Sequence, residues 1–264
     1  MAQVLELRKP GGAPATAPAP GDYVETPTAA NIARSLTLLR VMEPGAATMI
    51  AGAPGVGKSR ALAAYEAVAG QDCTMFTAAM GEGKPWNMGL ALLRSLRGPH
   101  RDVPRSLFDM RETIGRYFSE GSMLIVDEAQ HLDQPSAKGG QRHAGFEWLR
   151  AMAEETGCKL VLAGDLSLAS AVDRIPQLAS RMRRPVVIRR PAPGDVAAVA
   201  AAAGIADPAA VRILDAVAKR PGALRNVDNV LRIARLFAGA APVGAAHVGA
   251  AVQDLGLAPK GGRG

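Results

Sequence analysis

Two kinds of apolar pattern alternate along the first two thirds of the chain. Short stretches that are almost entirely apolar predict buried strands, and these are residues 47–51, 73–78, 123–127, 159–163 and 185–188. Longer stretches with apolar positions three or four residues apart predict helices, and these are residues 28–40, 58–69, 86–96, 106–119 and 141–155. Strands that alternate with helices predict a parallel sheet with helices on both faces.

The pattern changes near residue 195, after which no stretch is typical of a strand. Four Ala-, Leu- and Val-rich segments separated by Gly or Pro predict helices at residues 195–203, 208–219, 223–237 and 245–255. We therefore expect an α/β domain over residues 23–192 and a helical lid over 193–257. Residues 1–22, rich in Pro and Ala, are predicted to form a flexible leader, and residues 258–264 a basic tail. Thr28 is expected to cap the first helix.

Composition and charge narrow the function less than the pattern does. The formal net charge of +7 favours polyanions such as nucleic acid, although a merely soluble basic protein fits equally well. Cys73 and Cys158 stand far apart in no metal-binding spacing, which argues against a disulfide framework or a zinc site. The sequence has neither the roughly 20-residue apolar run of a spanning helix nor a signal peptide, so we expect a cytoplasmic protein without a membrane partner.

The segment between the first strand and the following helix matches GxxxxGK[ST], a phosphate-binding loop. Its glycines allow backbone N–H groups to point at phosphate oxygens, and the helix that follows adds its positive dipole end. Lys58 is predicted to reach the β- and γ-phosphates of ATP, and the Ser59 hydroxyl to ligate Mg²⁺. The predicted nucleotide-binding residues are Gly52, Ala53, Pro54, Gly55, Val56, Gly57, Lys58, Ser59 and Arg60.

A second acidic motif follows the apolar stretch 123–126, about seventy residues after the loop. Asp127 is predicted to bind magnesium from the side opposite Ser59. Glu128, one residue further, is predicted to act as the general base that accepts a proton from the attacking water. His131 could sense phosphate or contact a partner, but an ordinary polar position at a helix start is an equally good interpretation.

These features together resemble the AAA+ ATPases, over roughly residues 23–255. Within that superfamily the segments YVETPT, GAPGVGKS, VDEAQHL, LASRMRR and GALRNVDNVL resemble the phage Mu transposition protein B group, which includes TniB-like ATPases and has ExeA-like ATPases as neighbours. The resemblance implies an ATPase that oligomerises, as a ring or helical filament, on double-stranded DNA in the bacterial host cell. It further implies delivery of that DNA to a DDE-type transposase, with hydrolysis triggering disassembly.

The resemblance also assigns roles to residues outside the two motifs. Arg181 falls at the position of an arginine finger, with Arg183 as the alternative, although a basic helix end can also bind its own carbonyls. Arg225 falls at the sensor-2 position at the start of a lid helix. One departure concerns the fourth strand, which runs into Asp165 where the family has a polar residue that senses the γ-phosphate. We therefore expect slow hydrolysis in the absence of DNA or a partner.

Basic residues on three segments are candidates for sequence-independent contacts with DNA phosphates. Lys84 follows the second predicted strand and is the first choice, Lys138 and Arg142 follow the acidic motif, and Arg101 and Arg105 form a third cluster. For any single one of them, an ordinary solvated charge is the more common interpretation. Two other functions remain open from the sequence: an ExeA-like secretion or envelope-assembly ATPase, and a helicase loader or replication regulator.

Overall fold

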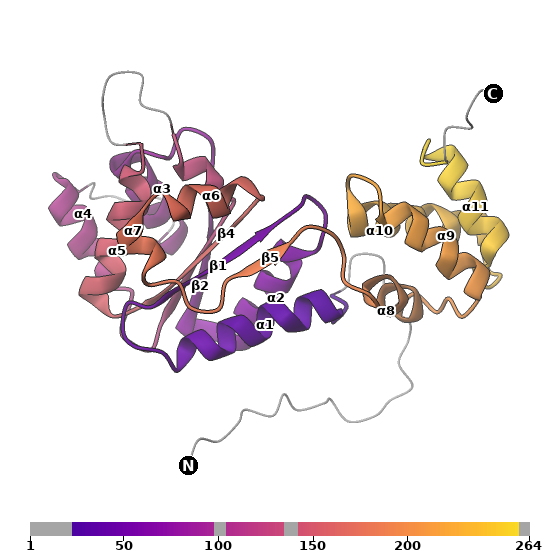
Figure 1. The fold of residues 1–264 in the computed structure, drawn as a ribbon, viewed down its shortest axis with the longest axis horizontal. Coiled ribbons are helices and arrows are strands. Elements are labelled where there is room, and N and C mark those ends of the chain that lie inside the picture. Colours follow the sequence, from indigo (N-terminus) through magenta and orange to yellow (C-terminus); the bar gives the residue numbers. More distant parts are fainter. Residues whose placement is uncertain (1–22, 98–103, 135–141, 259–264) are drawn as a thin grey trace, which may run out of the picture.

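The structure is a computed structural model, and it describes residues 23–97, 104–134 and 142–258 (Figure 1). The predicted leader 1–22 and nearly all of the predicted tail lie outside these residues. Five strands form one parallel sheet in the order β2-β3-β4-β1-β5. The strands are β1 Ala47–Gly52, β2 Cys73–Thr77, β3 Met123–Asp127, β4 Lys159–Gly164 and β5 Val186–Ile188. The predicted parallel sheet between helices is confirmed.

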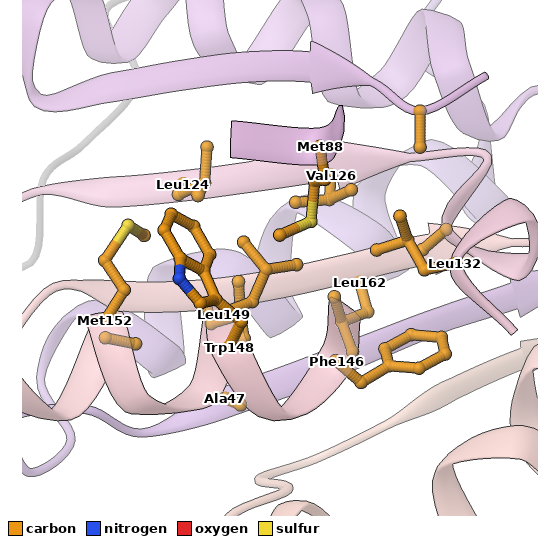
Figure 2. Close-up of a cluster of buried hydrophobic side chains, with 14 of the residues drawn as sticks. Ala47, Met88, Leu124, Val126, Leu132, Phe146, Trp148, Leu149, Met152 and Leu162 are labelled. Carbon is orange, nitrogen blue, oxygen red and sulfur yellow. The ribbon is translucent and has the colours of Figure 1, made fainter. Parts of the chain in front are cut away.

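Each face of the sheet has its own hydrophobic core, because alternate side chains of a strand point to opposite faces. Along β3, Leu124 and Val126 belong to one cluster, and Ile125 to the other. Figure 2 shows Leu124 and Val126 beside Met88 and Trp148, which come from the helices on that face. The helices of this face are α3 Pro85–Arg97, α4 Leu107–Gly115, α5 Ala144–Thr156, α6 Ser167–Asp173 and α7 Pro176–Ala179.

The opposite face is covered by α1 Pro27–Arg40 and α2 Lys58–Ala69. The prediction that Thr28 caps α1 was wrong. Thr26 is the cap, and its hydroxyl accepts a hydrogen bond from the Ala29 N–H at 3.2 Å. Pro27 takes the first helical position, where a missing N–H costs nothing, so the cap lies one residue before it. Thr28 is buried inside the first turn and bonds elsewhere.

Short helical segments account for most of the remaining differences from the predicted pattern. The 3₁₀ turns η1 Gly70–Asp72 and η2 Ala129–Leu132, like α6 and α7, were not predicted, because each is too short to show a helical period. The helix predicted over residues 106–119 ends at Gly115, and Ser106 is its cap.

Four helices follow the sheet and enclose a core of their own. They are α8 Asp195–Ala202, α9 Pro208–Ala218, α10 Ala223–Ala238 and α11 Ala245–Asp254. On α10 the buried positions Val227, Val230, Leu231 and Ala234 recur at helical spacing. Figure 1 shows α9, α10 and α11 grouped beside the sheet domain, with α8 below α10. Within the described part of the chain, no helix is long and apolar enough to cross a membrane.

The first lid helix is joined to the sheet domain by a buried carboxylate. Asp195 opens α8 and has no exposed surface. Its two oxygens accept hydrogen bonds from the Thr28 N–H at 2.9 Å, the Thr28 hydroxyl at 2.5 Å and the Ala192 N–H at 2.7 Å. Because burying a carboxylate is costly unless its oxygens are satisfied, these bonds fix where α8 starts relative to α1.

Candidate active site

A cleft of about 270 Å³ lies between the carboxyl ends of the strands and the lid helices. In parallel sheets of this kind, this edge of the sheet is where ligands bind. The lining of the cleft falls into two groups: the loop before α2 with the charged residues around it, and a mostly apolar group from residues 23–29, α8 and α10. We call these the phosphate end and the base end, after the phosphates and the nucleobase that a bound nucleotide would place there. The phosphate end consists of Gly52, Pro54, Gly55, Gly57, Lys58, Ser59, Arg60, Glu128, Asp165 and Arg225.

The loop between β1 and α2 requires glycine at two of its positions. Gly55 has φ 81° and Gly57 has φ 96°, both in the left-handed region that disfavours residues with a Cβ. The helix α2 then begins at Lys58, so its free N–H groups face the cleft. The Lys58 ammonium bends back over the loop and donates to the Gly52 carbonyl at 2.6 Å and the Ala53 carbonyl at 3.2 Å. This arrangement concentrates donors and positive charge around one small volume.

The Lys58 ammonium is partly desolvated and also faces carboxylates. Burial lowers the pKa of Lys58 below its ordinary value. The carboxylates of Glu128, Asp127 and Asp165 act in the opposite direction, and the Arg225 guanidinium adds to the lowering. The structure therefore brings Lys58, both acids of the second motif and Arg225 within electrostatic reach of one another.

Ser59 and Asp127 meet directly across the phosphate end. The Ser59 hydroxyl donates to Asp127 Oδ2 at 2.6 Å, and Asp127 is only 3% exposed. Hydroxyl and carboxylate oxygens are the donors that Mg²⁺ prefers, so the pair fits a magnesium ion. Among the residues that the structure describes, no group of three His, Cys, Asp or Glu side chains could hold a metal by itself. Such an ion would therefore take its other ligands from phosphate and water, which is the usual arrangement for Mg²⁺.

Glu128 leaves the strand in an unusual backbone conformation. Its φ is 53°, in the left-handed region, and its N–H donates to Asp127 Oδ1 at 2.9 Å. Non-glycine residues in this region cost free energy and occur often at functional sites. The turn directs the Glu128 side chain along the cleft edge, where its Oε2 accepts a hydrogen bond from Gln130 Nε2 at 2.5 Å. Gln130 was not predicted as a functional residue, since a lone glutamine carries no motif signal.

Asp165 also lies in the cleft, at the carboxyl end of β4. Its Oδ1 accepts hydrogen bonds from the Ser167 N–H at 2.8 Å and from the Ser167 hydroxyl at 2.5 Å. The carboxylate is thus tied to the first turn of α6. Whether this position is the one that senses the γ-phosphate stays a prediction.

The lid packs against the phosphate loop and against the start of α2. A Cβ added at Gly55 would lie 2.0 Å from the carbonyl oxygen of Gly222, so these two backbones are in direct contact. Arg60 forms an ion pair with Asp228 of α10 at 3.3 Å. Arg225, near the start of α10, lines the cleft between these contacts. The predicted sensor-2 residue therefore lies in the same cleft as Lys58.

The two candidate arginine fingers lie elsewhere. Arg181 Nη2 pairs with Glu154 Oε1 of α5 at 2.6 Å, and Arg183 Nη2 pairs with Glu43 Oε1 at 2.5 Å. Neither arginine lines the cleft. In this chain alone, both are engaged by acids on the sheet domain.

The base end was not predicted from the sequence. It is formed by three segments far apart in the chain: residues 23–29 before and within α1, the end of α8, and one face of α10. Helical periodicity marked several of these residues as apolar positions, but it could not show that they face one cavity. The lining residues are Tyr23, Val24, Thr26, Ala29, Val199, Ala202, Ala203, Leu231 and Arg235.

The basic candidates for nucleic acid lie away from the cleft. Lys84 is exposed just before α3, and Arg105 is exposed just before α4. Arg142 makes two hydrogen bonds to Asp133, at 2.7 and 3.0 Å, and Arg174 approaches the same carboxylate at 3.6 Å. These cations lower the pKa of Asp133, with the Arg142 hydrogen bond as the largest cause. Arg101 and Lys138 fall outside the described residues.

The loops that carry Lys84 and Arg142 are neighbours in space. A Cβ on Gly83 would lie 2.6 Å from the Gln134 side chain, and one on Gly145 would lie 2.9 Å from the Gly83 carbonyl oxygen. The segment after β2 and the segment after η2 are therefore packed together. Two candidates that the sequence separates by nearly sixty residues thus lie on adjoining loops.

Comparison with known proteins agrees with this geometry. A family profile described as "Mu B transposition protein, C terminal" matches residues 180–255, and one described as "AAA domain" matches residues 42–172. Two proteins named "ATP-dependent target DNA activator B", from Escherichia phage Mu and Escherichia phage D108, are each 28% identical over 229 residues. Each alignment covers 84% of this chain and 69% of the relative.

Solved structures of origin recognition proteins share the fold. The Aeropyrum pernix ORC2 protein, solved in ADPNP–ADP complexes, has a TM-score of 0.62 at 17% identity, covering 89% of this chain and 70% of its own. Drosophila ORC bound to DNA has a TM-score of 0.58 at 15% identity, covering 98% of this chain and 71% of the other. At such identities the likeness concerns the fold alone.

Proposed function

We propose that the chain, an AAA+ ATPase similar to the Mu B transposition proteins, binds ATP and Mg²⁺ in the cleft, assembles on double-stranded DNA and presents that DNA to a transposase. The nucleotide part of this proposal rests on the geometry of the cleft. The DNA and transposase parts rest on the names of the relatives and on the basic loops beside the sheet.

One observation carries the nucleotide part: a phosphate loop, a bonded Ser59–Asp127 pair and Glu128 meet at one edge of a parallel sheet. In the proposed complex Lys58 exchanges its bonds to the loop carbonyls for bonds to the terminal phosphates. Ser59 and Asp127 would hold the magnesium ion, which when bound neutralises charge on the phosphates. The N–H groups of the loop and of the first turn of α2 bind phosphate oxygens.

Hydrolysis needs a base and a way to stabilise charge on the transferred phosphoryl group. Glu128 lines the cleft and is the proposed base for the attacking water. Arg225 enters from the lid and is proposed to contact the γ-phosphate once the lid has closed. Arg181 is held by Glu154 on the chain's own surface, so its proposed role as a finger applies to the cleft of a neighbouring subunit. Arg183 is the alternative finger.

The adjoining loops that carry Lys84 and Arg142 support a single DNA-binding surface. Lys84 is exposed, and Arg142 and Arg174 are about half exposed around the Asp133 carboxylate. Phosphate contacts by such residues give affinity without sequence preference, and they weaken steeply as salt is added. Arg105 lies just before α4, with no described contact to these two loops, and is a weaker candidate for the same surface.

The relatives' name, ATP-dependent target DNA activator, supports a role for this chain in selecting target DNA for transposition. In that role the ATP-bound oligomer holds the duplex, and a DDE-type transposase captures it. Hydrolysis then releases the DNA, so it acts as a timer. The acid at position 165 in place of a polar sensor supports slow hydrolysis until a partner engages the oligomer.

The test is ATP-dependent binding of the chain to a fluorescent DNA duplex. Binding is measured by fluorescence anisotropy with and without Mg²⁺–ATP. We expect the wild-type chain to bind only with ATP and to lose affinity as salt rises. Lys58→Ala should abolish ATP-dependent binding and assembly, because the phosphates lose their main cation. Lys219→Ala, which removes an exposed lysine at the end of α9, is the matched control and should behave as wild type.

A second variant separates binding from release. Glu128→Gln removes the proposed base but leaves the phosphate loop intact, so it should assemble on DNA and dissociate more slowly than the wild type. Dissociation faster than that of the wild type would contradict the base role. DNA binding that does not weaken with salt, or that is the same with and without ATP, would contradict the DNA part of the proposal. It would not contradict the nucleotide site.

A further inference from the structure

The side chain of Gln130 connects the ends of two neighbouring strands. Its Nε2 donates to Glu128 Oε2 at 2.5 Å, and its Oε1 accepts from the Asp165 N–H at 3.1 Å. Glu128 follows β3 and Asp165 follows β4, which pair in the sheet. One amide group thus uses a donor and an acceptor to join the proposed base to the tip of the adjacent strand.

The Gln130 amide fits beside the backbone of Gly164, which has no side chain to fill that space. A Cβ added at Gly164 would lie 2.3 Å from Gln130 Oε1, so a side chain at position 164 would displace the amide. Gly164 does not have a positive φ, so what matters at this position is the space that glycine leaves and not its conformational freedom. Gly164, the last residue of β4, therefore leaves the room that the Gln130 amide occupies.

Glu128 depends on such a contact for its orientation. Its backbone is fixed in the left-handed region by the bond to Asp127, but its side chain has rotatable bonds and lies at the edge of an open cleft. A base acts efficiently only when its oxygen is held within hydrogen-bond reach of the water. Gln130 holds one carboxylate oxygen, Oε2, and thereby sets the direction of the other.

We propose that Gln130 is a positioning residue for ATP hydrolysis: it holds Glu128 in the orientation of a base and ties that orientation to the end of β4. This inference rests on the proposed function, since it assumes that Glu128 is the base. Gln130 need not touch the nucleotide. Its effect is on the rate of the hydrolytic step and not on the binding of ATP.

The variant that tests this most directly is Gln130→Glu. It keeps the length of the side chain and an oxygen for the Asp165 N–H, but it replaces the donor to Glu128 with a second carboxylate. We expect kcat for ATP, measured with DNA present, to fall at least about tenfold, while KM changes by less than about twofold. Gln253→Glu makes the same chemical change at an exposed position of α11 and should leave both constants unchanged.

Gln130→Met serves as a second variant if the added charge disturbs folding. It has nearly the same volume and neither hydrogen bond, so it should also lose kcat and keep its affinity for a fluorescent ATP analogue. An unchanged kcat in a folded Gln130 variant, or a loss confined to KM, would overturn the inference. A wild-type chain that binds no ATP would instead refute the nucleotide site itself, so the two failures are distinguishable.

Discussion

The two ends of the cleft are built in different ways. At the phosphate end, the functional side chains are adjacent in sequence to strand ends, and most are fixed by short hydrogen bonds such as that between Ser59 and Asp127. At the base end, the lining comes from α8, α10 and the segment before α1, and it is largely apolar. Apart from Arg225, which comes from the lid, the first end is formed by the sheet domain. The second exists only when the lid is seated against the sheet.

Because of this difference, the contacts between the sheet domain and the lid decide whether the two ends of the cleft form one site. We call these contacts the joint. The contacts that form it include the Gly55–Gly222 backbone contact and the buried Asp195 carboxylate that binds Thr28. A third, the ion pair between Arg60 and Asp228, is exposed to solvent. Substitutions at the joint should therefore damage the cleft in proportion to how closely each contact is packed.

The largest effect is expected from Gly55→Ala. The new Cβ would meet the Gly222 carbonyl at 2.0 Å, and alanine disfavours the φ of 81°. Either the loop deforms or the lid moves away, and in both cases the two ends no longer fit one nucleotide. We expect the affinity for ATP to fall about 100-fold, or about 2.7 kcal/mol, in calorimetric titrations.

Gly204→Ala is the matched control for that substitution. Gly204 has a similar φ of 77°, but no atom lies within 4 Å of a Cβ placed there. It should lose about 1 kcal/mol of stability from backbone strain and keep its affinity for ATP. If Gly55→Ala also bound ATP normally, the lid could not be in contact with the loop in the nucleotide-bound state.

Asp195→Ala should have the next largest effect, and it acts on stability. The Thr28 and Ala192 N–H groups and the Thr28 hydroxyl would lose their acceptor in a fully buried place. We expect the free energy of unfolding, from urea titration, to fall by about 2 kcal/mol. Asp207→Ala is the comparison, because Asp207 caps α9 by accepting from the Ala209 N–H at 2.8 Å and also accepts from the Ala245 N–H of α11 at 2.9 Å, but is less buried than Asp195. Its loss should be clearly smaller; equal losses would mean that the deeper burial of Asp195 adds nothing to the strength of its contacts.

Thr28 shows why the joint could not be predicted from the sequence. A threonine just before a helical period is typical of a cap, although Pro27, a residue favoured at the first helical position, is a local signal for Thr26. The actual partner of Thr28, Asp195, is 167 positions away. The sheet, its helices and the residues around the phosphates follow from short-range patterns. The phosphate loop is marked by a strand, a glycine loop and a helix in succession, and the Asp127–Glu128 motif by a strand that ends in an acidic pair. The base end, Gln130 and the lid contacts depend on packing between distant segments, for which a single sequence has no local signal.

A change at the base end should have a moderate effect that does not depend on the number of phosphates. Tyr23 lines that end and is 45% exposed, so its ring is available to a bound base. Tyr23→Ala should weaken ATP and ADP about equally, by about tenfold or 1.4 kcal/mol, whereas Tyr23→Phe keeps the ring and should bind as wild type. The measurement is competition against a fluorescent nucleotide. A loss for ATP alone would place the Tyr23 ring near the γ-phosphate and reverse the assignment of the two ends.

The smallest effect is expected from the exposed contact between the units. Arg60 and Asp228 lie 3.3 Å apart with side chains 55% and 20% exposed, and Arg232 also approaches Asp228, at 3.5 Å. Exposed pairs contribute little because water screens them and ordering long side chains costs entropy, and Arg232 can take over from Arg60. A double-mutant cycle of Arg60→Ala and Asp228→Ala should give a coupling free energy below about 1 kcal/mol in thermal or urea unfolding. A larger coupling free energy would mean that this surface ion pair helps the buried carboxylate and the packed glycines to hold the lid in place. In that case salt would weaken ATP binding in two ways, through lid closure and through the contacts with the phosphates.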